Sequence, residues 1–328
     1  MINRRMFIAS TAALLASSSF SRLSQAEERP LAGRLVFGLP AGAMGSKLAN
    51  GTLDILNTRF NAAYTLDVID ARNTQKATET VKAARPDGTT LLQVQSSSMV
   101  LFPSTYRSLN YDPSKDFTPL GVLGEYTFSL TLGPAVPAQV TDVDSYLAWV
   151  SANPDFRDIG FTLYGSQSHL LSLMLAREKQ IAVRPQPYKS PSSMVADLAN
   201  QTLAAAFTTP GNLELLGDSK GIRVIAVSSA TRLAQWPLAM TFAEQGLGNL
   251  TMSGWYGWFA PAAMPQETAR DLQQRLGDVQ ATDQFKQLQA SLLLTPANLQ
   301  PAQINARMTQ ETAMFQELVA SYGLSKIT

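Results

Sequence analysis

The sequence predicts an α/β fold, and two observations carry this prediction. From residue 34 the chain alternates short apolar stretches, typical of strands, with stretches of helical periodicity. A glycine-containing loop at residues 40–46 joins the first predicted strand to the first predicted helix. A strand, a loop and a helix in this order form a parallel-sheet unit, so we expect parallel strands that helices connect.

The first series of elements runs from residue 35 to residue 94. Residues 35–39 form a short apolar strand, and the apolar positions Ala49, Leu53, Leu56 and Phe60 then recur on one helix face. A strand at 64–68, a helical stretch to Arg85, a turn at 86–88 and a strand at 89–94 follow. The next segment, 102–124, contains three prolines, so we expect an ordered but irregular connection that ends at a domain boundary.

A second α/β series begins at residue 129. Its predicted elements are a strand at 129–132, a helix around 146–150, a strand at 159–163, a loop at 164–168, a helix at 169–177, a helix near 194–198 and strands at 203–207 and 222–227. After Gly254 an aromatic, extended stretch runs to Pro261. Two helices are then expected: the first opens at Pro265, and the last runs over 301–322 with Gly323 as its stop.

Composition excludes several classes of function. The 328 residues are 45% hydrophobic and 16% charged, and they include no cysteine and a single histidine. Disulfides, thiol nucleophiles, iron–sulfur clusters and histidine-rich metal sites are therefore excluded. After the first 26 residues, the remaining 302 hold 23 basic and 25 acidic residues, a net charge of −2. A nearly neutral surface disfavours binding to nucleic acid or anionic lipid, so charge recognition must come from one local site.

Residues 1–26 have the pattern of a signal peptide. Arg4 and Arg5 precede an apolar run from Met6 to Phe20, and small residues end at Ala26, after which we predict cleavage. The run is too short to span a bilayer, so we expect a soluble, exported mature protein. The arginine pair resembles the signal of the twin-arginine route, but Arg-Arg also occurs in ordinary secretory signals.

Two loops have the form of anion sites. A loop between a strand's carboxyl end and a helix N-terminus exposes unpaired amides and the positive end of the helix dipole, which favours a carboxylate. The alternative is that both loops are tight turns with capping serines. The two sets of candidate ligand-binding residues are Pro40, Ala41, Gly42, Ala43 and Ser46 in the first loop, and Gly165, Ser166, Gln167, Ser168 and His169 in and directly after the second.

Further candidates follow other strands at the same predicted sheet edges. Gln95, Ser96 and Ser97 follow one strand and Thr208 follows another, so each can face a ligand or cap a helix. His169 lacks both a suitable nucleophile and a Gly-x-Ser-x-Gly elbow, so we expect a structural role or a hydrogen bond within its loop rather than catalysis.

Aromatic and charged residues allow ligand roles and structural ones. At least two of Trp255, Tyr256, Trp258 and Phe259 are expected to fill a core, and one or two can line a cleft. Lys47, Arg72 and Lys189 are candidate carboxylate partners, although such residues usually face solvent. The acid pairs at 112/116 and 142/144 are assigned to turns and caps, because calcium would need more oxygen ligands.

Several stretches resemble the solute-binding proteins of tripartite tricarboxylate transporters, the TctC-type or Bug family. The resemblance spans nearly the whole mature chain, and the order and spacing of its pieces make it specific. The matching stretches are 40–43, 85–92, the Tyr-Asp-Pro-Ser-Lys-Asp-Phe-Thr-Pro-Leu motif at 111–120, 165–170, 187–189, 197–198, 225–227, Arg232, 242–246 and 255–265.

The resemblance implies a two-domain clamshell of the type II-like periplasmic-binding-protein kind, with a cleft between the domains. It implies domain 1 at residues 27–128 plus 250–328 and an inserted domain 2 at 129–249, with crossings near Phe128 and Trp255. The implied ligand is a small carboxylate, held through backbone amides and ordered waters. This sequence departs from the family pattern at three places. It has Ala43 and Ser46 where the family usually has a glycine and an aspartate, residues 71–76 where it has a glycine-rich segment, and Ser190 where it has a glycine.

These observations together predict a periplasmic receptor, not an enzyme, that captures a small organic carboxylate and delivers it to integral-membrane transporter subunits. The alternative is a sensory protein of the same fold that acts on a membrane signalling partner. We expect a monomer without cofactor or metal and without nucleic acid as a partner. Because Ser46 stands where the family has an acid, we hypothesise a carboxylate ligand without an amino group.

Overall fold

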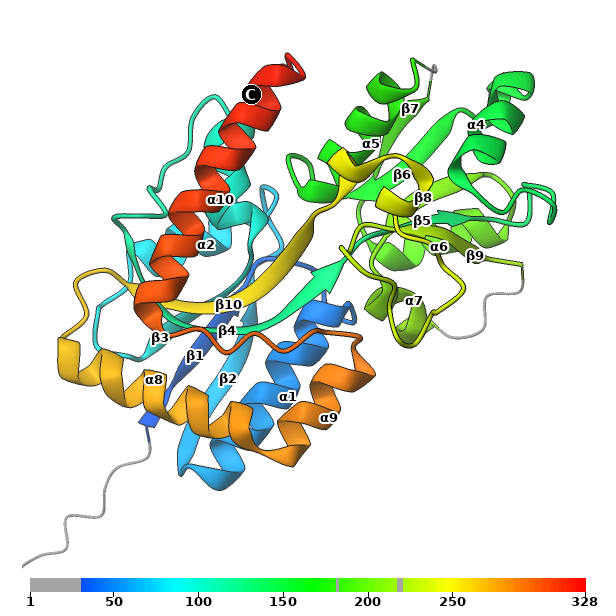
Figure 1. The fold of residues 1–328 in the computed structure, drawn as a ribbon. Helices are drawn as coiled ribbons and strands as arrows, with labels where there is room; N and C mark the ends of the chain where they lie inside the picture. The colour runs from blue at the N-terminus through cyan, green and yellow to red at the C-terminus, as the bar shows by residue number, and fades with distance from the viewer. Residues whose placement is uncertain (1–30, 181–182, 217–220) are drawn as a thin grey trace, which may run out of the picture.

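The computed structural model describes residues 31–180, 183–216 and 221–328. The predicted signal peptide, residues 1–26, lies outside the described residues. The described chain forms two α/β domains, and each is built on a five-stranded sheet (Figure 1). We name them sheet 1 and sheet 2, and the domains around them domain 1 and domain 2. The predicted α/β class and the two-domain clamshell are confirmed.

Sheet 1 has the strand order β2-β1-β3-β10-β4. The first three strands in the chain pair in parallel, whereas β10 is antiparallel to both of its neighbours. Sheet 1 therefore joins an early part of the chain to a late one. Its strands are β1 (Leu31–Phe37), β2 (Ala62–Val68), β3 (Thr90–Gln95), β4 (Phe117–Thr127) and β10 (Ser253–Pro261).

Helices cover both faces of sheet 1. The crossovers β1-α1-β2 and β2-α2-β3 run in opposite directions along the sheet, so their right-handedness places α1 and α2 on opposite faces. Helices α8 and α9 pack beside α1, and α10 packs on β4 and η1 (Figure 1). The helical elements of domain 1 are α1 (Met44–Arg59), α2 (Gln75–Lys82), the π-helical turn η1 (Ser97–Leu101), α3 (Phe102–Thr105), α8 (Gln266–Ala281), α9 (Asp283–Ser291) and α10 (Pro301–Ser321).

Sheet 2 has the strand order β7-β6-β8-β5-β9. Strands β6, β7 and β8 are parallel, and β5 pairs antiparallel with β8 and β9. The strands are β5 (Ser129–Leu132), β6 (Asp158–Thr162), β7 (Arg184–Tyr188), β8 (Ala205–Thr208) and β9 (Arg223–Val227). The helical elements are α4 (Val143–Ala152), η2 (Pro154–Phe156), α5 (Gln167–Glu178), α6 (Pro191–Ala199), α7 (Pro210–Leu216), η3 (Ala243–Gln245) and η4 (Gly248–Leu250).

Strand β10 explains the aromatic run near residue 255. Trp255, Tyr256, Trp258 and Phe259 are all at most 2% exposed, because β10 lies inside sheet 1 with helices on both faces. The indole N–H of Trp255 donates to Glu311 of α10, whereas Tyr256 faces α1. The expectation that at least two of these rings fill a core is confirmed.

The two connections between the domains meet at Ser228. Its hydroxyl accepts the backbone N–H of Phe128 at 2.9 Å and donates to the carbonyl of Met252 at 2.6 Å. The strands of sheet 1 stop at Thr127 and resume at Ser253, while all strands of sheet 2 lie between them in the chain. The domain limits 27–128 plus 250–328 and 129–249 stay a prediction.

Two expectations about secondary structure were wrong. The segment 102–124 is not an irregular connection throughout, because it contains α3 and most of the eleven-residue strand β4. Pro119 fits in β4 because this strand is at the edge of sheet 1, where a missing N–H breaks no ladder on the outer side. After β10 the described chain has three helices rather than two, since α9 follows α8 with only Thr282 between them.

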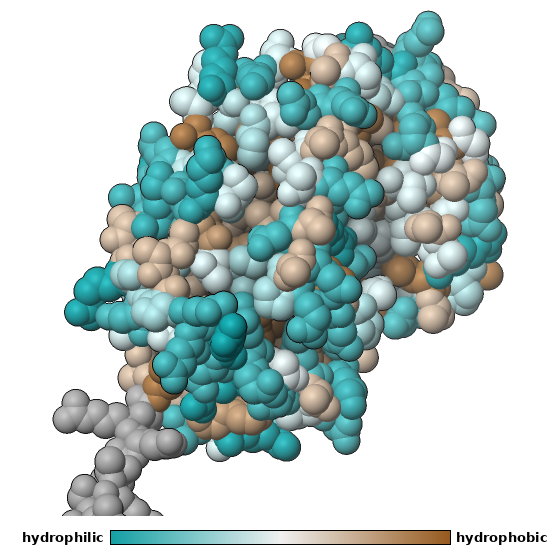
Figure 2. All heavy atoms as spheres, turned by 60° about the vertical axis from the view of Figure 1, so that its left-hand side comes forward, coloured by the Kyte–Doolittle hydropathy of each residue, from teal (hydrophilic) through white to brown (hydrophobic). Residues whose placement is uncertain are grey.

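The surface shown in Figure 2 carries hydrophilic side chains over most of its area, with hydrophobic ones in small groups. Within the described ranges, the large hydrophobic residues that are exposed are Val68, Tyr164, Leu238 and Met314. No helix in this part of the chain has both the length and the hydropathy that a bilayer crossing needs.

Candidate ligand-binding site

A cavity of about 630 Å³ lies between the two domains. It opens at the carboxyl ends of β1, β2, β3, β6 and β7, the edge where α/β sheets bind ligands. We name it the main cavity, and its volume suits a small organic molecule. Its lining residues are Leu39, Pro40, Ala43, Asp70, Ala71, Arg72, Asn73, Gln95 and Tyr256 from domain 1, and Thr162, Leu163, Tyr164, Pro187, Tyr188, Lys189, Pro191 and Asn212 from domain 2.

A smaller cavity of about 30 Å³ adjoins the main cavity and shares four lining residues with it, Gln95, Thr162, Pro191 and Asn212. We name it the inner cavity. It has room for roughly two water molecules, and both hydroxyl-bearing and apolar side chains line it. Its other lining residues are Ser97, Tyr126, Phe128, Ser166, Ser168, Met194, Val195, Phe207, Thr208, Thr209 and Leu213.

Two helices begin beside these cavities. The first N–H of α1, on Met44, donates to the side-chain oxygen of Asn212 in domain 2 at 2.9 Å. Helix α5 is capped by the Ser166 hydroxyl, while none of the described residues accepts from the backbone N–H groups of Gln167 and Ser168. Helix N-termini carry partial positive charge, so both starts favour an anion.

The first predicted loop is divided in the structure. Pro40 and Ala43 line the main cavity, whereas Ala41 and Gly42 are exposed outside it. Ser46 is 2% exposed, and its hydroxyl donates to the carbonyl of Ala43 at 2.9 Å. The Ser46 side chain therefore closes the first turn of α1 and does not line either cavity, so our hypothesis about the ligand's amino group loses its structural basis.

The residues after β3 divide in a similar way. Gln95 lines both cavities, and its amide donates to the Tyr256 hydroxyl at 2.8 Å. Ser97 lines the inner cavity and donates to the side-chain oxygen of Gln167. The Gln167 amide in turn donates to the Ser96 hydroxyl at 2.9 Å. Ser96 and Gln167 are thus buried contacts between the domains rather than cavity walls.

Gly165 and His169 lie on the other side of the second loop. They line a separate cavity of about 20 Å³ together with residues of α10 and the C-terminal segment. The Gly165 N–H donates to Nδ1 of His169 at 3.2 Å, and the imidazole stacks on Phe161 at 4.4 Å between ring centroids. Burial lowers the pKa of His169 to about 4, so the ring is neutral and serves as an acceptor for the loop. This geometry agrees with a structural role.

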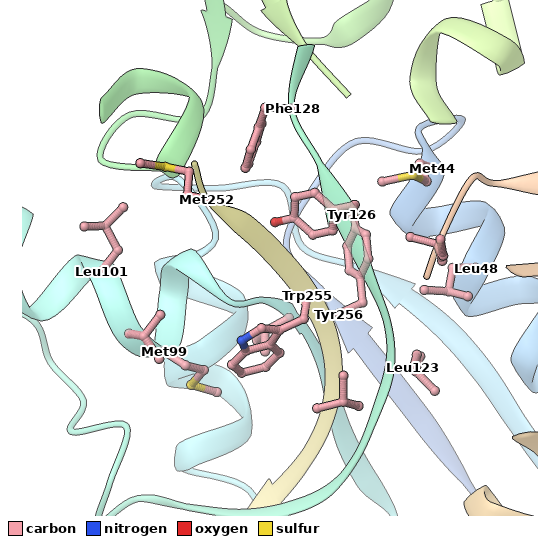
Figure 3. Close-up of a cluster of buried hydrophobic side chains, with 14 of the residues drawn as sticks. Met44, Leu48, Met99, Leu101, Leu123, Tyr126, Phe128, Met252, Trp255 and Tyr256 are labelled. Carbon is pink, nitrogen blue, oxygen red and sulfur yellow. The ribbon is translucent and has the colours of Figure 1, made fainter. Parts of the chain in front are cut away.

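Thr208 lies at the floor of the inner cavity. Its hydroxyl lies 2.7 Å from the hydroxyls of both Ser129 and Thr131, and all three residues are at most 3% exposed. Tyr126 and Phe128 also line this cavity, and Tyr126 packs against Phe128 at 5.4 Å and against Tyr256 at 5.0 Å between ring centroids (Figure 3). The lining of the inner cavity thus combines hydroxyl groups with aromatic rings.

Sequence reasoning missed several cavity residues. Asn212 was not a candidate because its helix, α7, was not predicted, although Thr209-Pro210 at a strand end is a helix-start pattern. Tyr164 and Tyr188 were not proposed as ligand residues either. Among the earlier charged candidates, Arg72 and Lys189 line the main cavity, and Lys47 does not.

The charged side chains that line the main cavity differ in whether they already have a partner. Arg72 forms an ion pair with Glu79 of α2. The described residues offer no hydrogen-bond or ion-pair partner to Lys189, and Asp70 is the acidic residue in the lining. No group of three or more metal-binding side chains exists within the described ranges. The site can therefore bind an anion through amides, hydroxyls and one unpaired ammonium group.

The two-domain fold with an interdomain cavity defines a periplasmic binding protein. The family model described as "Tripartite tricarboxylate transporter family receptor" matches residues 68–324, and the chain belongs to this family. Family members are periplasmic solute-binding receptors, and the chain is accordingly a receptor rather than an enzyme.

Individual relatives are distant in sequence and close in fold. Protein BugT of Bordetella pertussis is 24% identical over 245 residues, which are 74% of each chain. The periplasmic binding protein BugD has a TM-score of 0.83 at 21% identity, over 92% of this chain and 99% of BugD. The structure of R. palustris Rpa4515 with adipate has a TM-score of 0.84 at 21% identity, over 90% of this chain and 98% of that one.

Proposed function

We propose that this chain captures a small organic carboxylate between its domains and delivers it to the membrane subunits of a tripartite tricarboxylate-type transporter. The position of the main cavity carries the proposal. Its walls come from both domains, so a ligand inside it contacts both and stabilises the closed form. Membership of the receptor family supports the transporter role, and the adipate in the similar Rpa4515 supports a carboxylate ligand.

One carboxylate group fits the junction of the two cavities. There it meets the N-termini of α1 and α5, and the backbone N–H groups of Gln167 and Ser168, which have no acceptor among the described residues, can donate to it directly or through water. Among the residues predicted to bind the ligand, we propose that those lining a cavity contact it directly or through water. We propose that the others stabilise the loops around the cavities. The cavity-lining members are Pro40, Ala43, Gln95, Ser97, Ser166, Ser168 and Thr208.

Lys189 is the side chain best placed to add charge attraction. It follows β7, lines the main cavity and is unpaired among the described residues. Arg72 already neutralises Glu79, so it offers less to a ligand. A lysine at the cavity mouth attracts carboxylates from solvent, and this attraction weakens as salt rises.

The remaining proposals concern export and assembly. We propose that residues 1–26 direct export and are removed, and that the mature receptor works as a monomer in the periplasm. N-terminal sequencing of the protein from a periplasmic extract should begin at Glu27. Size-exclusion chromatography with light scattering should give the mass of one mature chain.

Titration of the mature chain with acids tests the ligand class. Thermal shift and calorimetry would compare dicarboxylates, tricarboxylates, aromatic acids and amino acids, each beside its neutral amide. A ligand that binds only the native state raises the melting temperature as its concentration rises. We expect a rise with at least one acid and none with the matched amide.

The variant Lys189→Met tests the charge argument, with Lys326→Met as its control outside the main cavity. We expect Lys189→Met to weaken binding about threefold to tenfold at low salt, and less at high salt. Lys326→Met should bind like the wild type. Equal binding of an acid and its amide, or no binding of any acid by the wild type, would contradict the proposed ligand class.

A further inference from the structure

Two loops that face each other across the main cavity have backbone in the left-handed region. In domain 1, Arg72, Asn73 and Thr74 are consecutive residues with φ of 49°, 50° and 69°. In domain 2, Leu163 has a φ of 67°. Arg72, Asn73 and Leu163 all line the main cavity. The left-handed conformation is unfavourable for residues other than glycine. Contacts with neighbouring residues must therefore stabilise both loops in this conformation.

Within domain 1, contacts fix both ends of the 72–74 loop. The Thr74 hydroxyl lies 2.7 Å from the Ser98 hydroxyl in a buried contact, and Arg72 pairs with Glu79. Asn73 lies between these anchors, and its side-chain amide donates to the Tyr106 hydroxyl at 3.0 Å. The middle residue of the run therefore depends on Tyr106.

The same Tyr106 hydroxyl also bonds to domain 2. It donates to the carbonyl of Tyr164 at 3.1 Å, the residue that follows Leu163. The phenol ring is 6% exposed and packs against Phe102, at 4.8 Å between ring centroids, and beside Gly165, where a Cβ would lie 2.9 Å from the ring. One buried hydroxyl thus links the two left-handed loops.

We propose that Tyr106 is a positioning residue that sets the shape of the 72–74 loop for ligand binding when the domains close. In the closed form the Tyr106 O–H donates to the carbonyl of Tyr164. This bond polarises the phenol and makes the Tyr106 oxygen a stronger acceptor for the Asn73 amide. Opening removes the Tyr164 carbonyl, frees the phenol O–H to turn, and loosens the Asn73 contact. This inference rests on the proposed function, because it concerns the wall of the same cavity.

Tyr111 provides a matched control in the same segment. Its hydroxyl is buried and donates to the backbone carbonyl of Ser98 at 2.8 Å, so both partners belong to domain 1. Tyr111→Phe removes a tyrosine–carbonyl bond of the same kind without touching the domain interface. Any effect specific to closure should therefore distinguish Tyr106→Phe from Tyr111→Phe.

Binding kinetics and domain closure test the proposal. For the acid that binds most tightly in the titration, we expect Tyr106→Phe to weaken affinity roughly tenfold, as expected for two lost hydrogen bonds. The loss should appear as faster dissociation with an unchanged association rate. Asn73→Ala should weaken binding less, and the double variant should be no weaker than Tyr106→Phe alone, because both changes break one linked pair.

Closure can be measured without any ligand. The chain has no cysteine, so dye labels on Gln310→Cys in domain 1 and Asp155→Cys in domain 2 report the distance between domains. Tyr106→Phe should shift the unliganded distance distribution towards open forms, and Tyr111→Phe should leave it unchanged. This readout separates the two proposals, since a wild type that binds no acid overturns the ligand class while the labels still report on Tyr106.

Three results would overturn the role of Tyr106. The first is a Tyr106→Phe variant with wild-type affinity and closure. The second is an equal loss in Tyr111→Phe, which would indicate a general effect on domain 1. The third is a double variant with Asn73→Ala whose losses multiply, because independent effects would exclude a shared bond.

Discussion

The backbone N–H of Met44 donates to the side-chain oxygen of Asn212 at 2.9 Å, so a helix of domain 1 is capped by a residue of domain 2. The N-cap position of α1 is Ala43, which has no side chain that can accept a hydrogen bond. Domain 2 therefore supplies the cap that α1 lacks in its own sequence. The amide of Asn212 also donates to the Thr209 hydroxyl at 2.6 Å, which fixes its direction.

Asn212→Ala should weaken ligand binding through the loss of this cap. A lost N-cap costs about 1 kcal/mol, which corresponds to roughly a fivefold rise in Kd when it affects only the closed form. Calorimetry on the variant measures the change. Asn153→Ala is the control, because the Asn153 amide bonds to Trp149 inside domain 2. Unchanged affinity in Asn212→Ala would show that the cap does not contribute to closure.

Gly211→Ala should block closure by steric overlap. A Cβ at position 211 would lie 2.2 Å from the carbonyl oxygen of Leu292 and 2.5 Å from the sulfur of Met44, both in domain 1. Because a backbone atom cannot move aside easily, we expect at least a tenfold loss of affinity, the scale of overpacking. The melting temperature without ligand should not fall. Gly248→Ala, with no heavy atom within 4 Å of the added Cβ, should bind normally.

The neutral state of His169 predicts how stability depends on pH. Burial lowers its pKa from 6.5 to about 4 in the folded protein, so the unfolded chain binds the proton more readily. Stability from this group is complete above about pH 6.5 and falls as pH drops to about 4, by roughly 2–4 kcal/mol. Below that pH both states are protonated and the contribution stays constant.

His169→Asn should flatten this pH dependence. Asparagine can accept the N–H of Gly165 as Nδ1 does, but it does not titrate. Urea unfolding of the variant and the wild type at pH 7, 6, 5 and 4 measures the difference. Two parallel stability curves would show that another group causes the acid sensitivity.

Arg307 should be important for the stability of domain 1. Its guanidinium lies 2.6 Å from Glu311 and 2.5 Å from Glu125 of β4, and the side chains of all three residues are at most 30% exposed. Arg307→Met leaves two half-buried carboxylates without their cation, so we expect a loss of about 1–3 kcal/mol. Lys286→Met, which breaks an exposed pair with Asp283, should cost at most about 0.5 kcal/mol. Equal losses in denaturant titrations would contradict this ranking.

The strand and helix pattern predicted most of the fold, and the two strands that it missed have a common physical cause. Residues 184–188 were not predicted as a strand, because Pro185 and Pro187 disfavour one, and Pro119 obscured β4 in the same way. Both β7 and β4 are edge strands, where proline removes no hydrogen bond from a neighbour. Local sequence does not reveal which strands will be at an edge, so proline was weighted too heavily.

The candidate site was predictable only as far as it follows strand ends. The rule that ligands bind at carboxyl ends of strands identified Pro40, Ala43, Gln95 and Thr208, which do line the cavities. Contacts between the two domains, such as that of Met44 with Asn212, join residues 168 positions apart. Which residues meet in these contacts depends on how the two domains pack together, and no local sequence pattern shows this.

The place of β10 in sheet 1 also determines the order in which the chain can fold. Strand β4 is made early, yet it reaches β3 only through β10, which begins at residue 253. Sheet 2, in contrast, takes all of its strands from residues 129–227. As the polypeptide lengthens, domain 2 can therefore complete its sheet while domain 1 still lacks β10, the strand that joins β4 to β3. We expect the inserted domain to fold first and domain 1 to fold after it, once β10 has been made.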